Sequence, residues 1–505
     1  MPAYPHRQAQ SGAVLLIMLV IMVVGIAAVL VSSLNSSGIK NARQNNSAAV
    51  LVQAKEALIG RAVSDMNRPG TLPCPDALTD IVGTNIPGDG IADLLAGNEC
   101  PSYIGRLPWK TLGISDLRDG TGAPLWYALS RNFRDDNSNM INSETNGTLT
   151  VSGNQTVNNV AAIVFAPGAP LCAQSRGANA ALNQYLEAMT TVAATNAVIA
   201  NASNDCANSP YNDQHLAITA TQLIQPVEMR IGREAKACLD NYAAINGGKY
   251  PWASDSTDIS FSYSKSNTLF GRLPKHQTPD NRVRDMLSSI KNFQVAVTNC
   301  ANGVGSQSTL ESLGSTLKND ANDVKYNQPT TPAIPTTVTN PAANAGDKAK
   351  DADVTCSDIQ SDPTGNDIQT NLNNAISALN SLDSTFPWPA SCTLFSPTNG
   401  YWSNWKNQVF YQVDDKYKPS GVLGTPSITM NSVGNYRAIV VVARSPISGQ
   451  VRNPLIAPPI GYLEGGNAHT SSTPNTDFIA NRSIDAGFSN VNDLVLCLDG
   501  QNKCK

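Results

Sequence analysis

Two acidic, asparagine-rich stretches carry oxygen side chains at spacings that suit a calcium ion. The stretch NFRDDNSNMINSE places Asp135, Asn137 and Asn139 at alternating positions. Hard oxygen ligands spaced in this way can converge on Ca²⁺ where the backbone curls, although a methionine follows where such a loop takes glycine. The stretch PGDGIAD offers Asp89 and Asp93 in a similar way. Both stretches are candidate calcium sites, and the plainer interpretation is that they are acidic turns.

A cluster of aromatic residues in the second half of the chain is a candidate binding surface. The sequence FPWPASC…GYWSNWKNQVFYQ contains Trp402, Trp405 and Tyr411 within a short interval. Tryptophan and tyrosine can stack on a sugar or fill a protein interface. The alternative is that the tryptophans pack beneath a sheet, as core residues.

The sequence offers little support for catalysis. It contains no GxSxG elbow, no HExxH, no P-loop and no GxGxxG after a strand. Only His215, His276 and His469 follow the first twelve residues. The net charge is −4, without a basic stripe that would indicate nucleic-acid binding. We therefore predict that the protein is not an enzyme, requires no cofactor and binds no nucleic acid.

Ten cysteines suggest disulfides made in an oxidising compartment, since charged residues are only 15% of the chain and an export segment precedes the cysteines. No pair has the CxxC spacing of a zinc site. Sequence proximity favours four pairs and leaves a fifth to form across an insertion. The candidate pairs are Cys74 with Cys100, Cys172 with Cys206, Cys300 with Cys356, Cys497 with Cys504, and Cys238 with Cys392.

The elements that position these residues begin with an apolar run near the amino terminus. Ala13 to Val31 contains no charged residue, and as a helix it would match the hydrocarbon core of a bilayer. The run is too long for a secretory signal and no small-x-small cleavage site follows it. Beyond it, Ser47 to Asn67 repeats apolar residues at three- and four-residue spacing until Pro69-Gly70. We predict one long helix whose first half spans the inner membrane.

A polar leader that ends in Gly12 directly before the apolar run resembles the amino terminus of the type IV pilin and pseudopilin superfamily. The resemblance implies that a prepilin peptidase cuts between Gly12 and Ala13, and that the freed helix packs into a filament core. Most members carry glutamate at the fifth mature position, but here that residue is Ile17. Members without this glutamate, such as the K-type pseudopilin, lie at or near the filament tip, and the K type binds calcium. A plain single-pass anchor is the alternative.

Six short sequence phrases recur in the same order in the two halves of the chain. The first half contains TLPCPD, GRLPW, PLWYALSRNF, VAAIVFAPGAPL, NQYLE and NDQHLAIT. The second half contains KYPWASD, GRLPK, NQVFYQVDDKY, YRAIVVVARSPI, GYLEG and NDLVLCL. A helix precedes each set. The order favours a duplication over the chance recurrence of strand and turn vocabulary.

The predicted fold class is α+β, with a long amino-terminal helix followed by two tandem heads of the pilin type, each a helix on an antiparallel sheet. VAAIVFA and YRAIVVVA are expected to be buried central strands. The predicted organisation is a leader (1–12), a long helix (13–68), a first head (69–221) and a second head (222–505) interrupted by an insertion (277–384).

The insertion is predicted to be a helical hairpin with a Pro/Thr-rich middle. Its two ends, NRVRDMLSSIKNFQVAVTNC and NDIQTNLNNAISALNSL, have helical periodicity, whereas QPTTPAIPTTVTNPAANAGDKAKDAD has no apolar periodicity and should be an extended linker. Insertions on loops often contact partners, but a spacer without a partner is an equal alternative.

These observations favour a minor subunit of a type IV pilus or a type II secretion-type filament, located at the tip, which initiates assembly or presents an adhesive surface. The expected partners are other pilin-like subunits, the prepilin peptidase, the inner membrane before assembly, and a surface or secreted-protein ligand. The head would lie in the periplasm and later in an extracellular or periplasmic filament. A membrane-anchored periplasmic interaction protein outside any filament is the second hypothesis, and a secreted carbohydrate-active enzyme is the third.

Overall fold

The computed structural model divides into two compact units. The first contains Met1–Arg61, Thr71–Asn139 and Asn146–Ala220, and the second contains Ala62–Gly70, Met140–Thr145 and Thr221–Lys505. The structure describes residues 11–77, 88–137, 139–151, 156–171, 174–177, 182–187, 189–193, 196–199, 212–254, 268–275, 281–327, 336–380, 388–389, 391–395, 401–452, 459–469, 476–480 and 491–499.

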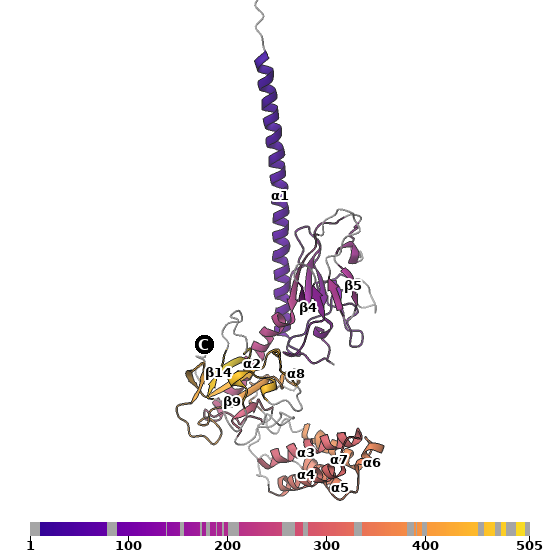
Figure 1. The fold of residues 1–505 in the computed structure, drawn as a ribbon, viewed down its shortest axis with the longest axis vertical. Coiled ribbons are helices and arrows are strands. Elements are labelled where there is room, and N and C mark those ends of the chain that lie inside the picture. Colours follow the sequence, from indigo (N-terminus) through magenta and orange to yellow (C-terminus); the bar gives the residue numbers. More distant parts are fainter. Residues whose placement is uncertain are drawn as a thin grey trace, which may run out of the picture. The chain divides into compact units, whose positions relative to one another are not determined.

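Helix α1 runs without interruption from Ser11 to Ser64, over 54 residues, and is the indigo helix of Figure 1. The segment contains no proline and has many alanine, leucine and valine residues, which allow a helix to propagate. Leu51, Ala54 and Leu58 are buried, and this three- and four-residue spacing places them on one face of the helix. The helix packs through that face, as its periodicity predicts.

The helix ends five residues before the Pro69-Gly70 stop that the sequence suggests. The Oδ1 atom of Asp65 accepts the backbone N–H groups of Asn67 and Arg68, each at 2.8 Å, so the chain turns directly after the last helical residue. Gly70 then donates its N–H to the Ala62 carbonyl at 2.8 Å with a φ of 104°. Glycine adopts this conformation without steric cost.

The sheet of the first unit contains seven strands. They are β1 (Ile104–Arg106), β2 (Trp126–Leu129), β3 (Leu149–Val151), β4 (Val157–Ala166), β5 (Met189–Ala193), β6 (Asn196–Ile199) and β7 (Gln214–Thr219). Strand β4, which contains the run VAAIVFA, is the central strand because β2, β3 and β7 all pair with it antiparallel. Two 3-10 turns, η1 (Arg131–Phe133) and η2 (Leu182–Gln184), lie between strands.

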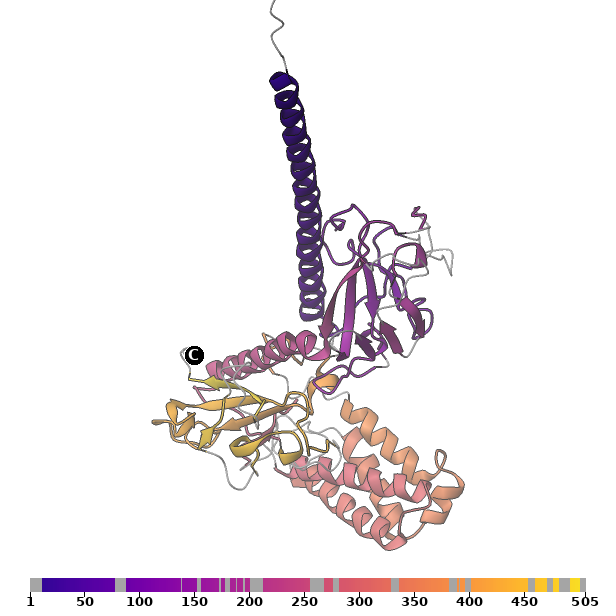
Figure 2. The same ribbon diagram turned by 45° about the horizontal axis from the view of Figure 1, so that its top comes forward.

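The second unit has its own helix and two sheets (Figure 2). Helix α2 (Ala220–Ile245) packs closely on the larger sheet, since a side chain at Gly232 would overlap Leu496. The larger sheet contains β8 (Phe270–Arg272), β9 (Val409–Val413), β12 (Ala438–Val442) and β14 (Leu494–Leu498), and the smaller contains β10 (Ile428–Met430), β11 (Val433–Tyr436) and β13 (Asp477–Phe478). Short helical turns are α8 (Trp402–Trp405), η4 (Pro459–Gly461) and η5 (Gly465–Asn467).

The two units share one strand order and one register. The antiparallel neighbours β1, β2, β4 and β7 correspond to β8, β9, β12 and β14. In the first unit Tyr127 pairs with Gly105 on one side and Val164 on the other. In the second unit Tyr411 pairs in the same way with Gly271 and Val440. The recurring sequence phrases therefore occupy corresponding strands.

The insertion in the second unit forms a helical bundle with its own core. Its helices are α3 (Asn281–Ala301), α4 (Gln307–Asn327), α5 (Thr336–Lys350), α6 (Cys356–Ser361) and α7 (Asp367–Asn380). The prediction of an extended Pro/Thr-rich linker is wrong for residues 336–350, because α5 buries a narrow face of small side chains, including Ala342, Ala345 and Ala349. Gly314 and Gly346 let the backbones of α4 and α5 approach closely.

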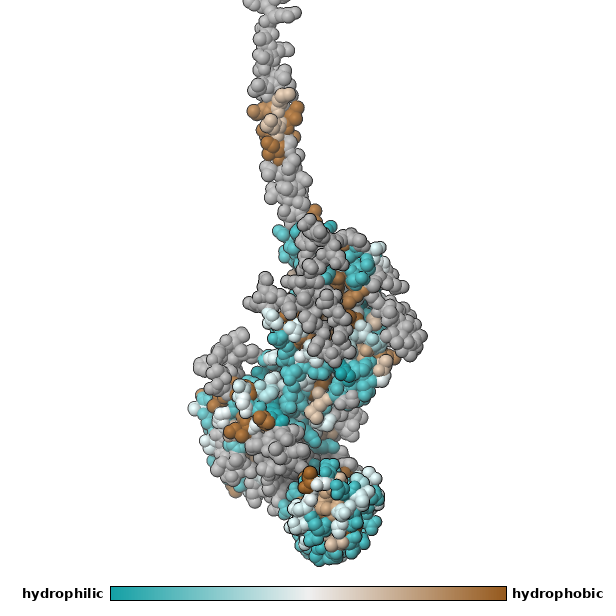
Figure 3. All heavy atoms as spheres, turned by 45° about the vertical axis from the view of Figure 1, so that its right-hand side comes forward, coloured by the Kyte–Doolittle hydropathy of each residue, from teal (hydrophilic) through white to brown (hydrophobic). Residues whose placement is uncertain are grey.

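The predicted membrane-spanning half of α1 is also wrong. Within the residues that the structure describes, no helix is both long enough and apolar enough to cross a membrane. The described side chains of Met18–Val24 and Ile26 in this helix are apolar and exposed. The fold is α+β. Figure 3 shows these side chains as a brown band on the helix.

Candidate functional site

The first candidate calcium stretch lies just after η1 in the first unit. Asp135 and Asn137 are exposed, whereas Asn139 is half-buried and donates its N–H to the Asp136 carbonyl at 3.2 Å. The buried acid of this turn is Asp136, whose carboxylate pairs with Arg134 at 2.8 Å. Sequence reasoning passed over Asp136, which holds the turn by an ion pair.

The second candidate stretch surrounds a buried carboxylate that the sequence did not single out. Asp76 accepts the N–H groups of Gly88 and Gly90, each at 2.7 Å. Burial, together with the nearby charges of Asp89 and Asp93, raises the pKa of Asp76 to about 6. Asp89 accepts the N–H of Ile91 within its own turn, and Asp93 accepts the N–H of Ala77 at 3.0 Å.

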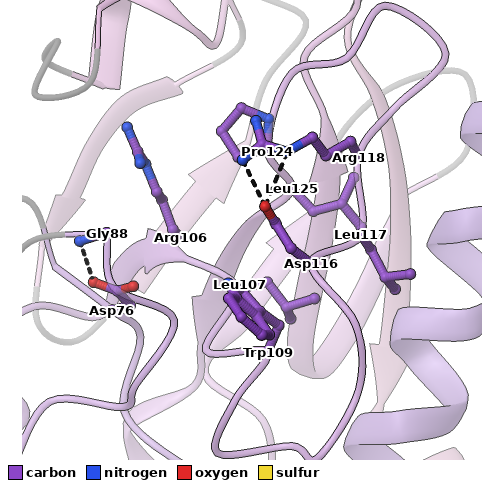
Figure 4. A pocket seen from close by; sticks show the side chains of 10 residues that line it. All are labelled: Asp76, Gly88, Arg106, Leu107, Trp109, Asp116, Leu117, Arg118, Pro124 and Leu125. Atoms are coloured by element: carbon purple, nitrogen blue, oxygen red, sulfur yellow. Dashed lines mark hydrogen bonds and ion pairs between the residues drawn. The ribbon is translucent and has the colours of Figure 1, made fainter.

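Asp76 lines a small cavity of about 70 Å³ in the first unit. Figure 4 shows Asp76 hydrogen-bonded to Gly88 at one side of the view and the ion pair of Asp116 with Arg118, 2.6 Å, at the other. Arg106 and Trp109 also line the cavity, which has room for two or three water molecules.

No group of three or more His, Cys, Asp or Glu side chains that could hold a metal ion occurs in the described part of the chain. Calcium binding at Asp135, Asn137 and Asn139, or at Asp89 and Asp93, stays a prediction, because asparagine and backbone oxygens can also be ligands.

The three aromatic residues predicted as a candidate binding surface are buried. Trp402 is 6% exposed, and Trp405 and Tyr411 are fully buried. Tyr411 lies in the central part of its sheet and donates its hydroxyl to the Pro251 carbonyl at 2.9 Å. These residues belong to the core of the second unit and offer no surface to a ligand, so the structure favours the core alternative.

His469 is another residue of the second unit's core. Its Nε2 lies 2.7 Å from Gln412 Oε1, and its ring lies 3.7 Å from the ring of Phe270, between centroids. Burial lowers the pKa of His469 to about 4. The side chain is therefore neutral at physiological pH and serves packing.

Three disulfides join described cysteines; two of them are pairs that sequence proximity favoured, and the third is the pair left to form across the insertion. They are Cys74–Cys100, Cys300–Cys356 and Cys238–Cys392. Cys497 is also disulfide-bonded. Cys504 and the pair Cys172–Cys206 lie outside the described residues.

The expected processing site lies in the first turn of α1, which begins at Ser11. Gly12, Ala13 and Ile17 are helical there, and their side chains lie outside the described ones. The cleavage and the missing assembly glutamate stay predictions.

A pair of acids in the first unit, the half-buried Glu187 and the buried Asp213, was missed by the sequence analysis. Glu187, which follows η2, donates its N–H to Asp213 Oδ2 at 2.7 Å, and Glu187 Oε2 accepts the N–H of Asn212 at 3.3 Å. Gln174 donates to Glu187 Oε1 at 3.0 Å. Arg176 contacts Gln174 Oε1 at 3.0 Å and lies over the ring of Tyr185, which precedes the pair.

The second unit contains the same arrangement. Glu464 donates its N–H to Asp493 Oδ2 at 3.0 Å, and Glu464 Oε2 accepts the N–H of Asn492 at 3.0 Å. Gln450 donates to Glu464 Oε1 at 2.9 Å. Arg452 contacts Gln450 Oε1 at 3.2 Å and, like Arg176, lies 5.2 Å from the centroid of a tyrosine ring. We call these two groups the acid clasps.

Burial dominates the electrostatics of both clasps. Burial and the nearby charge of Glu187 raise the pKa of Asp213 to about 8. Burial and the charge of Glu464 likewise raise the pKa of Asp493 well above its ordinary value. In each clasp the charge of the neighbouring glutamate adds to the effect of burial and favours the protonated form of the aspartate. Two adjacent carboxyl groups shielded from water retain one proton more readily than an isolated carboxyl group does.

The clasps fasten a loop to a strand that pairs with the central strand. In each unit the glutamate comes from a segment after the central strand, and the aspartate stands directly before a strand that pairs with it, β7 in the first unit and β14 in the second. The phrases NQYLE with NDQHLAIT, and GYLEG with NDLVLCL, carried this signal, because an acid recurs at the same place in each phrase.

The first unit also contains an open groove of about 650 Å³ between α1 and the edge of the sheet. Its lining residues are Ile39, Lys40, Arg43, Gln44 and Ser47 from α1, and Thr121, Ala166, Gly168, Ala169, Asn212, Asp213 and Gln214 from the head. A hydrogen bond from the Gly120 N–H to Ser47 Oγ, 2.9 Å, fixes the helix at one end of the groove.

No protein-family model matches the chain, and no similar protein was found among curated proteins or among solved structures.

Proposed function

We propose that the protein is a structural subunit that joins a multi-chain assembly through α1, as an accessory subunit of a pilin-type filament. The observation that carries the proposal is the exposed apolar band of α1, formed by Met18–Val24 and Ile26. These side chains are between 48% and 68% exposed.

The band extends around the helix. Seven consecutive residues cover about two turns, so apolar side chains point in every direction from the axis. A helix that is apolar all round is normally buried on all sides, and exposed apolar patches of this kind mark interaction sites. Several partner helices around α1 would cover the band, whereas one flat partner would cover a single face.

The rest of α1 supports this proposal. The described side chains from Gly38 to Asn46 are exposed, and the first buried one is Ser47. The head therefore holds the carboxyl-terminal part of the helix and leaves the band uncovered within the chain. A helix that packs on a head at one end and exposes apolar side chains at the other is suited to packing in the core of a filament.

The test compares two aspartate substitutions in the same helix. Ile21→Asp places a charge in the band, whereas Val52→Asp places one at a position that is 52% exposed beside the head. Sedimentation velocity of the purified full chain is expected to show concentration-dependent assemblies for the wild type and Val52→Asp, and single chains for Ile21→Asp. A single-chain wild type, or equal assembly of all three proteins, would contradict the proposal.

A second experiment tests the filament class. Coexpression with a prepilin peptidase, followed by mass spectrometry, is expected to give a mature chain that starts at Ala13. Gly12→Leu should leave the leader attached. An intact leader in the wild type would remove the pilin-type part of the proposal and would leave assembly through α1 unaffected.

A further inference from the structure

We propose that the two acid clasps are proton-operated latches, which hold the Tyr-Leu-Glu turn of each head closed while one proton is shared between the aspartate and the glutamate, and which release that turn when the proton is lost. This inference is independent of assembly through α1.

The repeated geometry is the first support. Both clasps place a glutamate backbone N–H on an aspartate Oδ2, and a glutamate Oε2 on the N–H of the asparagine before that aspartate. Both also place the glutamine amide on glutamate Oε1. Three hydrogen bonds of this kind would not recur by accident at sites formed by residues 26 and 29 positions apart.

The unpaired aspartate oxygens are the second support. Asp213 and Asp493 are 5% and 2% exposed, and no described group donates a hydrogen bond to the buried Oδ1 atom of either residue. A bare carboxylate oxygen in this position would be costly. A proton on Oδ1 turns the atom into a donor to the neighbouring glutamate and removes the cost.

Two charged groups around the first clasp are bound to other partners, and neither replaces the proton shared by Asp213 and Glu187. Arg176 faces the pair, but its guanidinium is directed to the Gln174 side chain and to the Gln184 and Tyr185 carbonyls. Asp119 is held by the Gly168 N–H at 2.7 Å. From α1, Lys40 and Arg43 line the groove on which Asp213 borders.

The second clasp has a comparable environment. Arg452 faces the pair and lies 3.8 Å from Glu144, and Asn467 donates its amide to Asp493 Oδ2 at 3.1 Å. Arg444 and Glu228 form a separate ion pair at 3.1 Å. In both heads the arginine that faces the pair also donates to other acceptors, so loss of the proton would leave two adjacent carboxylates at a site where the aspartate is buried.

Release should expose particular backbone amides. In the first head, the N–H groups of Tyr185 and Leu186 donate to the Leu182 carbonyl and that of Glu187 donates to Asp213. In the second head, those of Tyr462 and Leu463 donate to the Pro459 carbonyl and that of Glu464 donates to Asp493. Hydrogen exchange at these six amides therefore reports the state of each latch.

The experiment measures hydrogen exchange of the full chain at about pH 5 and about pH 9, corrected for the intrinsic rate. We expect the protection of the six amides to fall about tenfold or more at the higher pH. Asp213→Asn mimics the protonated acid and should keep the first turn protected at both pH values while the second still opens. Asp493→Asn should do the reverse, and the exposed Asp415→Asn is the control.

Each variant carries the other head as an internal reference. The proposal would be overturned if the wild-type turns were equally protected at both pH values. It would also be overturned if the first turn of Asp213→Asn lost as much protection at the higher pH as the first turn of the wild type. Infrared spectroscopy of the wild type gives a test that needs no variant to fold. The carbonyl stretch of a protonated carboxylic acid should persist at neutral pH, and its absence would also overturn the proposal.

Discussion

Tyr127 and Tyr411 occupy the same place in two different sheets and make the same hydrogen bond. Tyr127 donates its hydroxyl to the Pro73 carbonyl at 3.2 Å, and Tyr411 donates to the Pro251 carbonyl at 2.9 Å. Both side chains are fully buried, and burial raises both pKa values well above that of free tyrosine. Agreement in register, burial and partner supports the origin of the two heads by duplication.

Removing either hydroxyl should destabilise its own head. Tyr127→Phe or Tyr411→Phe leaves a buried proline carbonyl without its donor, which costs about 1–3 kcal/mol. Urea unfolding followed by tryptophan fluorescence would measure the loss in the free energy of unfolding. Tyr326→Phe is the matched control, because Tyr326 is 70% exposed. Equal stability of all three variants would show that the two hydrogen bonds contribute nothing.

Gly105 and Gly271 should not tolerate a side chain. A methyl group on Gly105 would overlap the Asp76 carbonyl, and one on Gly271 would overlap the Ser254 carbonyl. Because both obstacles are backbone atoms, Gly105→Ala and Gly271→Ala should each cost about 1–3 kcal/mol or lower the soluble yield. Thermal unfolding would measure this. Gly60→Ala, in α1 with open space around it, should be neutral or slightly stabilising.

The second head should lose stability in mild acid through His469. Its pKa in the folded state, about 4, lies below the ordinary value of 6.5 because the ring is buried. Between these values the unfolded chain binds the proton and the folded head does not, so stability falls as the pH falls from about 6.5 to about 4, by up to roughly 1.4 kcal/mol per pH unit. Above pH 6.5 this contribution is fully present.

The variant His469→Gln separates this effect from the rest of the titration. Glutamine cannot take up a proton, so the slope of stability against pH between about 4 and 6.5 should flatten, whatever the absolute stability of the variant. Urea midpoints at several pH values give the slope. A slope equal to that of the wild type would show that His469 does not contribute to it.

The helical bundle should not tolerate a larger side chain at the close contact between α4 and α5. Gly346→Ala would place a methyl group against the Gly314 carbonyl and should loosen the two helices by about 1–3 kcal/mol. Hydrogen exchange at amides of α4 and α5 would detect faster opening. Asn344→Ala, an exposed position in the same helix, should leave exchange unchanged or slower. Unchanged exchange in Gly346→Ala would mean that the helices can separate without penalty.

Local patterns in the sequence determined much of the architecture. The recurring phrases gave the corresponding strands, since a near-continuous apolar run such as VAAIVFA has to form a buried strand. The three- and four-residue spacing of Leu51, Ala54 and Leu58 gave the face of α1 that packs. Chain proximity suggested Cys74–Cys100 and Cys300–Cys356, and Cys238–Cys392 was the remaining pair; all three are present.

Other features depend on contacts between residues that are far apart in the sequence, which a local sequence pattern does not reveal. The small side chains of α5 form a packing face only because Gly314 of α4 lies against them, so the segment looked like a linker. For Trp402 and Trp405 the sequence favoured a place in the core over a binding surface, and their burial decided between the two. The apolar run at the amino terminus was taken for a membrane span on its composition, whereas no described helix has the length and apolar character of one.

The acid clasps show most clearly which features the sequence determines and which depend on the tertiary structure. The sequence by itself determined that Glu187 and Glu464, and Asp213 and Asp493, stand at corresponding places in two repeats. Only the tertiary structure decided that each glutamate meets its aspartate in a buried site. The physical reason is that protonation depends on the distance between charges and on access to water, and both are set by how the loop folds back onto the strand.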